Sequence, residues 1–205
     1  MNTETSSPTS DVAYLRELAE AGRQAPPDAG PYLVAGGGWF ALASLAIGLG
    51  EAGLIPASPS LPPVAMLVAF AGFAVSMALL MRRDRGKVQN DANRFVGAAW
   101  SAIGISIFVF WIAVMIVAAR TGDGSILNSI SLMVLAAYGA AWRFTGELFG
   151  KALGNAVTGL CFASMVGVAL ATGTPWMWLG YAAALVLCAV LPGLALMRQA
   201  RAAQA

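Results

Sequence analysis

One stretch of this chain combines charged side chains with a regular spacing. Arg143, Glu147 and Lys151 follow one another at intervals of four residues, and glycines recur at the same interval one residue earlier. On a helix, this spacing places a positive, a negative and a second positive charge on one face, beside a groove without side chains. We take the three charges as the candidate functional cluster and the glycines as helix-packing residues, namely Gly146, Gly150 and Gly154.

Two interpretations of this stretch are open. In the first, residues 143–151 are a link between two helices at the cytoplasmic rim of a membrane. In the second, the helix continues past Trp142, and the charges are paired along one face and partly buried. A charge held at bilayer depth costs at least about 2.5 kcal/mol, whereas a pair at i, i+4 returns only about 0.2–0.5 kcal/mol. This difference favours the first interpretation, but whether the stretch is a loop or a continuous helix is left open.

No other pattern in the sequence indicates a cofactor, a metal site or catalysis. The chain has no histidine, the commonest zinc ligand and the usual general base at neutral pH. It contains neither a G-x-S-x-G nucleophile motif nor a phosphate-binding loop. Cys161 and Cys188 lie in apolar runs at similar depth, and we expect buried, free thiols. Glu51 is expected to be solvated, and Asn128 to cap a helix or face headgroups. The sequence therefore predicts a protein that is not an enzyme.

The composition predicts an all-α protein of the membrane. Of its 205 residues, 59% are hydrophobic and 11% are charged, whereas soluble proteins have about 25% charged residues. Its apolar runs of about 20 residues match the thickness of a bilayer's hydrocarbon core. We predict one domain over residues 31–197, a bundle of six transmembrane helices. The predicted spans are 31–50, 62–81, 95–119, 125–142, 152–171 and 175–197.

Two cytoplasmic tails flank this domain in the prediction. Within residues 1–30, apolar side chains fall on one face of an amphipathic helix at about 11–24, and two prolines end it. We expect this helix to lie on the bilayer surface. The alternative is that it binds a cytoplasmic partner. Residues 198–205 form the second tail.

The basic residues predict the orientation of the spans. Eleven of the 12 lysines and arginines fall on one side of this topology, and only Arg120 falls on the other. The positive-inside rule assigns the basic side, with both chain termini, to the cytoplasm. The chain's length, its richness in Ala, Gly and Leu, and its preference for Arg over Lys are typical of bacterial inner-membrane proteins. We therefore predict a multi-pass protein of the bacterial inner (cytoplasmic) membrane.

Small residues at intervals of four predict where the helices touch, because close backbone contact drives helix association in lipid. We predict that the fifth and sixth spans pack along two such rows. In the sixth span, Pro192 should free the backbone carbonyl of Cys188 and kink the helix. The rows are Gly159, Ala163, Gly167 and Ala171 in the fifth span, and Gly180, Ala184 and Cys188 in the sixth.

These features favour a small membrane protein that acts through protein or lipid contacts, as an accessory or regulatory subunit. Its expected partners are the lipid bilayer and another membrane or cytoplasmic protein, or a second copy of the chain. The net charge of +2 argues against nucleic acid as a partner. The alternative is a transporter or channel for a small solute or ion that uses Arg143, Glu147 and Lys151. This alternative is less favoured because no charged group lies well inside a span.

Overall fold

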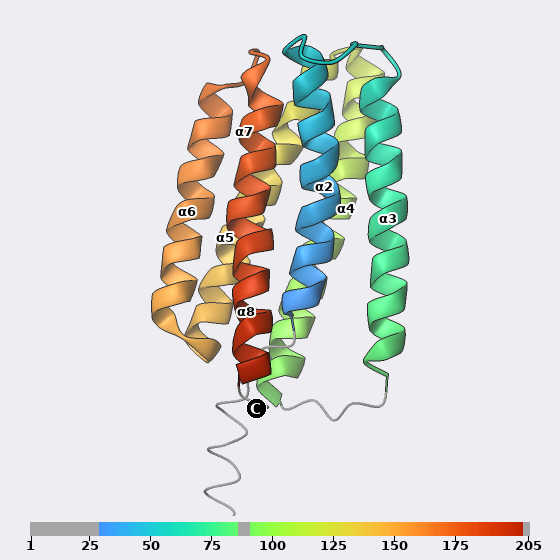
Figure 1. The fold of residues 1–205 in the computed structure, drawn as a ribbon. Coiled ribbons are helices and arrows are strands. Elements are labelled where there is room, and N and C mark those ends of the chain that lie inside the picture. The colour runs from blue at the N-terminus through green and yellow to red at the C-terminus, as the bar shows by residue number, and fades with distance from the viewer. Residues whose placement is uncertain (1–28, 86–90, 203–205) are drawn as a thin grey trace, which may run out of the picture.

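Six long helices make up most of the structure, a computed structural model that describes residues 29–85 and 91–202 (Figure 1). The predicted all-α class is confirmed for these residues, which contain helices and no strand. Six of the helices are long and apolar enough to cross a membrane. The predicted amphipathic helix at about 11–24 lies outside the described residues. In chain order the helices are α2 (Gly30–Glu51), α3 (Leu61–Arg83), α4 (Asp91–Thr121), the 3-10 helix η1 (Gly124–Asn128), α5 (Ser129–Phe149), α6 (Lys151–Leu170), and a last helix that joins α7 (Trp176–Leu185), the π-helical turn η2 (Val186–Val190) and α8 (Leu191–Ala202).

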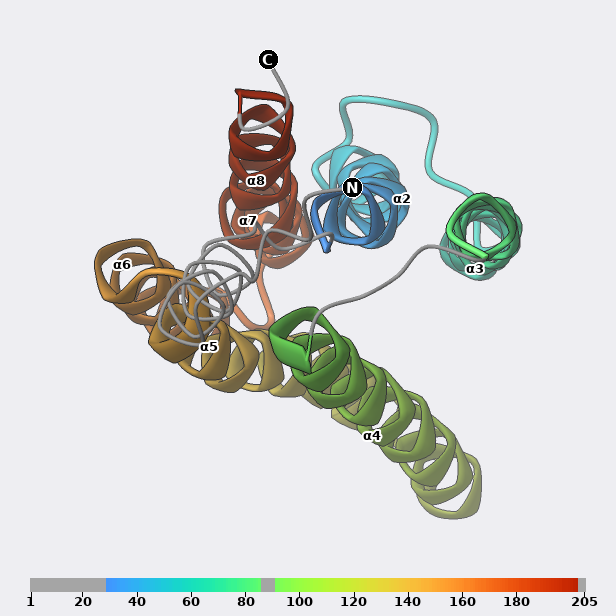
Figure 2. The ribbon, with the colours of Figure 1, turned by 90° about the horizontal axis from the view of Figure 1, so that it is seen from below.

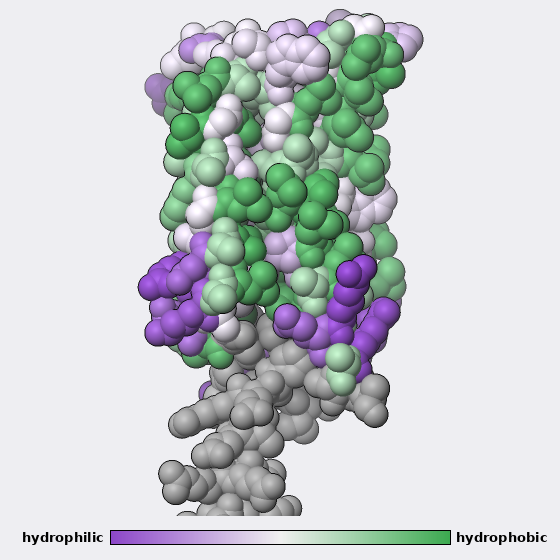
Figure 3. Space-filling view, turned by 60° about the vertical axis from the view of Figure 1, so that its left-hand side comes forward, coloured by the Kyte–Doolittle hydropathy of each residue, from purple (hydrophilic) through white to green (hydrophobic). Residues whose placement is uncertain are grey.

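The helices lie in two layers. Seen from below, α2 lies between α3 and the last helix, and α5 lies between α4 and α6 (Figure 2). Successive helices run in opposite directions, so the ends of α3, α5 and α8 lie with the starts of α4 and α6. Figure 3 shows hydrophilic side chains gathered there, below a mostly hydrophobic surface. We call this the basic end, and the opposite end, which carries Arg120, the distal end.

Glycines let α2 pack closely against the last helix. A Cβ placed on Gly37 would lie 2.6 Å from the Cβ of Ala189, and one placed on Gly48 would lie 2.8 Å from the side chain of Leu179. Such contacts are closer than real side chains make, so these positions require glycine. Close backbone approach is the usual way to hold helices together where lipid surrounds them. Gly37, the middle one of three consecutive glycines at 36–38, is therefore a packing residue.

The neighbouring pair, α2 and α3, is joined by contacts between phenylalanine rings, by the side chain of Trp39 and by two hydrogen bonds. The indole of Trp39 covers Gly72 of α3, where a side chain would collide with the ring. Its N–H donates to the Oγ of Ser76 at 3.1 Å. Near the basic end, the hydroxyl of Tyr32 donates to the Oδ2 of Asp84 at 2.9 Å. The layer that contains α2 is thus held at mid-height and at one end.

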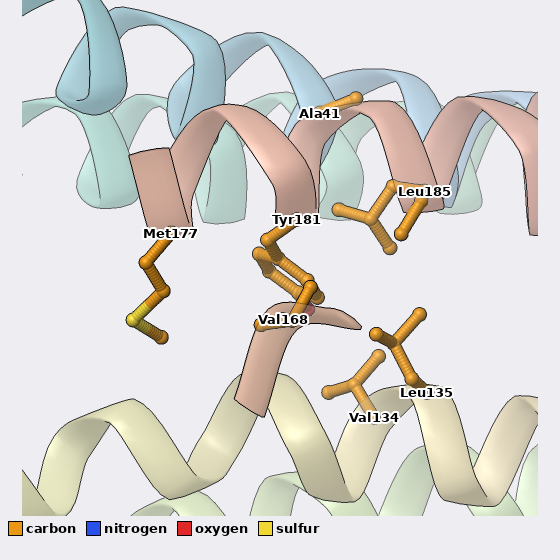
Figure 4. Close-up of a cluster of buried hydrophobic side chains, with 8 residues drawn as sticks. Ala41, Val134, Leu135, Val168, Met177, Tyr181 and Leu185 are labelled. Atoms are coloured by element: carbon orange, nitrogen blue, oxygen red, sulfur yellow. The ribbon is translucent and has the colours of Figure 1, made fainter. Parts of the chain in front are cut away.

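The hydrophobic core lies between the two layers. In the distal half, side chains of α7 point toward Val134 and Leu135 of α5 (Figure 4). A second cluster in the basic half contains Cys161 and Cys188, both fully buried and both free thiols, as predicted. The distal cluster consists of Ala41, Val134, Leu135, Val168, Met177, Tyr181, Ala184 and Leu185. The second consists of Leu33, Trp142, Val157, Cys161, Cys188 and Leu196.

The last helix has a π-helical turn just before Pro192, and the structure supplies a partner for the carbonyl that this proline is predicted to free. The turn before the proline is π-helical, which is a common response to a lost backbone hydrogen bond. The orphaned carbonyl oxygen of Cys188 accepts a hydrogen bond from the Nε1 of Trp142, at 2.8 Å. Trp142 belongs to α5 and is 1% exposed. This bond therefore links α5 to the last helix inside the core.

The fifth and sixth spans do meet, but the row of small residues predicted to make this contact on α6 is wrong. Gly159, Ala163 and Gly167 of α6 are exposed, and a Cβ on either glycine would meet no atom within 4 Å. Gly180 is also exposed, and its nearest neighbour is Val168 at 4.0 Å, whereas Ala184 is buried in the distal core. The reason is that α6 turns its other face, with Gly154, Val157, Cys161 and Val168, toward the interior.

The bond between Trp142 and Cys188 gives a test of this packing. Replacing Trp142→Phe keeps an aromatic side chain but removes the indole N–H. The buried carbonyl of Cys188 then has no donor, which should lower the free energy of unfolding by about 1–3 kcal/mol. Replacing Pro192→Ala returns a backbone N–H that the Cys188 carbonyl can accept. The loss caused by Trp142→Phe should therefore be smaller in the Pro192→Ala background. Unfolding of the purified protein in detergent measures both, and an equal loss in the two backgrounds contradicts the assignment.

Candidate functional site

The charged cluster lies on a helical hairpin at the basic end. Helix α5 does not end at Trp142 but continues to Phe149, and Gly150 alone separates it from α6. Gly150 has φ 141° and ψ 106°, a conformation that other residues adopt only under strain. Gly146 is the one residue between 143 and 149 that disfavours a helix, and a single glycine does not end one, so α5 continues to Phe149. The stretch 143–151, which was expected to link two helices, is therefore itself helical except at Gly150.

Two glycines bring α5 and α6 into backbone contact just above this turn. A Cβ placed on Gly146 would lie 2.8 Å from the Cα of Gly154, and one placed on Gly154 would collide with the Gly146 backbone. Further along, the hydroxyl of Thr158 donates to the carbonyl oxygen of Gly139 at 3.1 Å. The glycines that the sequence places in one groove thus lie on two helices that face each other, with Gly150 as the turn between them.

The charged side chains form a ladder across the hairpin. Arg143 Nη2 lies 3.0 Å from Glu147 Oε1, and Lys151 Nζ lies 3.1 Å from Glu147 Oε2. Arg143 and Glu147 are on α5, whereas Lys151 is the first residue of α6. Arg143 also donates to the Oδ1 of Asn155 on α6. The sequence predicts for Asn155 only a role in capping a helix or facing headgroups, because only the hairpin brings residues 143 and 155 together.

The ladder is an exposed feature of the surface. The side chains of Arg143, Glu147 and Lys151 are 53%, 42% and 72% exposed. A hollow at the base of the hairpin has a volume of about 10 Å³, room for no more than about one water molecule. This exposure agrees with the first interpretation of the stretch, while its helical conformation agrees with the second. Chemically, the ladder neutralises its own carboxylate and leaves one positive charge in excess.

A second group of polar residues lies at the distal end, and sequence reasoning did not join them. Glu51, Asn128, Thr174 and Trp178 line an open cleft of about 330 Å³. They come from the end of α2, the η1–α5 junction, the α6–α7 link and α7. Asn128 precedes α5 but makes no side-chain capping bond. The only signal in the sequence was a carboxylate at the end of an otherwise uncharged span.

The contact between Gly146 and Gly154 gives a matched pair of variants on one helix. Gly154→Ala forces a methyl group into the backbone of α5 and should lower the free energy of unfolding by about 1–3 kcal/mol. Gly159→Ala introduces the same methyl group into open space. It should leave stability unchanged or raise it by up to about 1 kcal/mol, because alanine favours helix. Unfolding in detergent compares them, and equal effects would show that the hairpin is not closely packed.

The ladder should contribute little to stability. Glu147→Gln removes both ion pairs, but exposed pairs are each worth about 0–1 kcal/mol. We expect a loss of at most about 1 kcal/mol at low salt and a smaller loss at about 1 M salt, where charges are screened. The same unfolding measurement at two salt concentrations checks this. A large, salt-independent loss would contradict the exposed position of Glu147.

Comparison with known proteins adds no relative. No family model matches the chain, and neither a curated protein nor a solved structure gives a match. What the protein does is therefore inferred from its own contacts.

Proposed function

We propose that this protein is an accessory subunit of the bacterial inner membrane, which acts by binding another membrane protein and has no catalysis of its own. Its six helices form a bundle across the bilayer, with the basic end and both termini in the cytoplasm. The distribution of charge supports this orientation, because basic residues flank five helix ends at the basic end while Arg120 lies at the other. The partner contacts it within the membrane.

The observation that carries this proposal is the uncovered row of small residues on α6. Gly159, Ala163 and Gly167 follow at intervals of four, and all three are exposed. Small residues at this spacing allow a second helix to approach the backbone closely, which is the main source of helix association in lipid. Inside this chain the same device is used at Gly37 and Gly154, where a neighbouring helix fills the groove. On the outer face of α6 the groove is left for another chain.

Helices α3 and α4, one from each layer, also leave much of their surface uncovered. In the most apolar 18-residue stretch of α3, and likewise of α4, only 6% of the residues are buried, whereas 50% are buried in the corresponding stretches of α2 and the last helix. Lipid covers such aliphatic surfaces well, so they give no preference for a protein. The glycine row differs from them, because a helix fits against it more closely than mobile acyl chains do.

The alternative, transport of a solute or ion, receives less support from the geometry. Arg143, Glu147 and Lys151 are exposed, and Glu147 is satisfied by its two neighbours. The hollow beside the hairpin is about the size of one water molecule. An ion path needs polar groups that line a continuous route at depth, and the ladder lies at a helix end.

Affinity purification in mild detergent from the native membrane tests the proposal. The wild-type chain should retain a companion at fixed stoichiometry, either a different membrane protein or a second copy. Gly159→Leu together with Gly167→Leu should reduce that companion at least about tenfold, because two isobutyl groups block close approach. The measurement is the molar ratio of companion to bait in the purified complex.

The matched control is Gly97→Leu together with Gly104→Leu on α4. Both of these glycines are helical and exposed, and a Cβ placed on either of them would meet no atom within 4 Å. These substitutions should leave the ratio unchanged. If no companion is retained, and vesicles with purified protein show a solute flux that Arg143→Gln with Glu147→Gln abolishes, the transport alternative replaces this proposal.

A further inference from the structure

The cleft at the distal end brings together residues that are far apart in the chain. It has a volume of about 330 Å³ and opens to the surface where α2 ends and α7 begins, at the top of Figure 1. Pockets for small molecules commonly have volumes of about 300–1,000 Å³. The lining residues are Glu51, Asn128, Gly173, Thr174, Pro175, Met177 and Trp178. The cleft is therefore large enough for a small organic molecule and is mixed in polarity.

The charge in this cleft is a single carboxylate without a counter-ion. In the described part of the chain, no arginine or lysine forms an ion pair with Glu51. Glu51 is also the last residue of α2, where the helix dipole adds negative potential. At the basic end, by contrast, the carboxylate of Glu147 has two cations within 3.1 Å. Of these two carboxylates, Glu51 is the one left to attract a positive charge from outside.

Two further groups suit a cation that carries N–H donors. Trp178 lines the cleft, and its indole N–H is directed to the Glu51 carboxylate, which keeps the ring beside the charge. The face of an indole attracts cations, and tryptophan is the best of the aromatic residues for this contact. Its ring is fixed against Tyr181, with ring centroids 6.3 Å apart. The half-buried carboxamide of Asn128 makes no capping bond to α5, so its oxygen is available as an acceptor.

We propose that this cleft binds a small organic ammonium ion, through the carboxylate of Glu51, the indole face of Trp178 and the amide oxygen of Asn128. A primary ammonium group donates up to three hydrogen bonds and carries the charge that Glu51 lacks. The same chemistry occurs in a free amine and in the headgroup of an aminophospholipid. The inference is independent of the proposed partner contact on α6, because the two features lie on different faces of different helices.

Titration with ethanolamine tests the site in nanodiscs made only of phosphatidylglycerol, whose headgroup has no amine. Isothermal titration calorimetry should show saturable binding to the full chain. Glu51→Gln should weaken the binding about tenfold or more, and Trp178→Leu about threefold or more, because each removes one attraction to the cation. Absence of saturable binding to the wild-type chain, or binding that Glu51→Gln leaves unchanged, would overturn the proposal.

A variant that gains affinity distinguishes loss of a ligand contact from loss of binding through misfolding. Asn128→Asp adds a second carboxylate to the cleft and should tighten ethanolamine binding several-fold. The matched controls are Glu147→Gln and Asn155→Asp, which make the same two changes at the basic end and should have no effect. If Asn128→Asp does not tighten binding, or if the controls change it equally, ethanolamine is not bound in this cleft.

A second set of nanodiscs that contains phosphatidylethanolamine distinguishes the two sources. If ethanolamine binds there as tightly as in phosphatidylglycerol, the ligand is a free amine. If the lipid blocks ethanolamine, and native mass spectrometry finds phosphatidylethanolamine retained by the wild-type chain but not by Glu51→Gln, the ligand is the headgroup. Both results support an ammonium site. Blocking by the lipid with equal retention by both chains contradicts it.

Discussion

Backbone contact between Gly146 and Gly154 is the constraint on which the basic end of this structure depends. Neither residue has a side chain, so α5 and α6 meet at their backbones within a few residues of the turn at Gly150. This closeness brings Asn155 to Arg143 and places Lys151 on the far side of Glu147. The charged ladder is therefore a consequence of the glycine contact. The ion pairs themselves are too exposed to hold two helices together.

The same helix, α5, is tied to its other neighbours by groups that satisfy one another's hydrogen bonds. Trp142 donates to the carbonyl that Pro192 leaves free in the last helix. Trp100 of α4 donates to the hydroxyl of Thr145 at 3.1 Å, and that hydroxyl donates to the carbonyl of Ala141 at 2.9 Å. An unpaired polar group in hydrocarbon costs several kcal/mol, so each of these donors has few acceptable alternatives. These hydrogen bonds thus specify which helices pack against α5, whereas aliphatic side chains pack equally well against other helices or lipid.

The sequence was sufficient for the features that depend on neighbouring residues. Apolar runs and the charges that flank them predict six helices of spanning length, and Pro192 predicts the freed carbonyl at Cys188. The sequence was insufficient to predict which face of α6 packs against the other helices, because two faces of α6 carry small residues. The hairpin turn at Gly150 places the face with Gly154 against α5. Partners distant in the chain were also beyond reach. Trp142 is separated by 46 residues from the carbonyl that it binds, and the distal cleft joins Glu51 to residues near 128 and 174.

The two ends of the molecule differ in how their carboxylates are compensated, and this difference bears on function. Glu147 is bracketed by Arg143 and Lys151, so the chain itself supplies the charges that stabilise it. Glu51 has no such cation in the described residues, yet it lies at the edge of an apolar span beside an indole. Glu51 is exposed, so a cation from solution can reach it, and the attraction between opposite charges favours its binding. The regularly spaced charges therefore compensate one another within the chain, whereas the isolated carboxylate has no compensating charge among the described residues, and the proposed ammonium site depends on this difference.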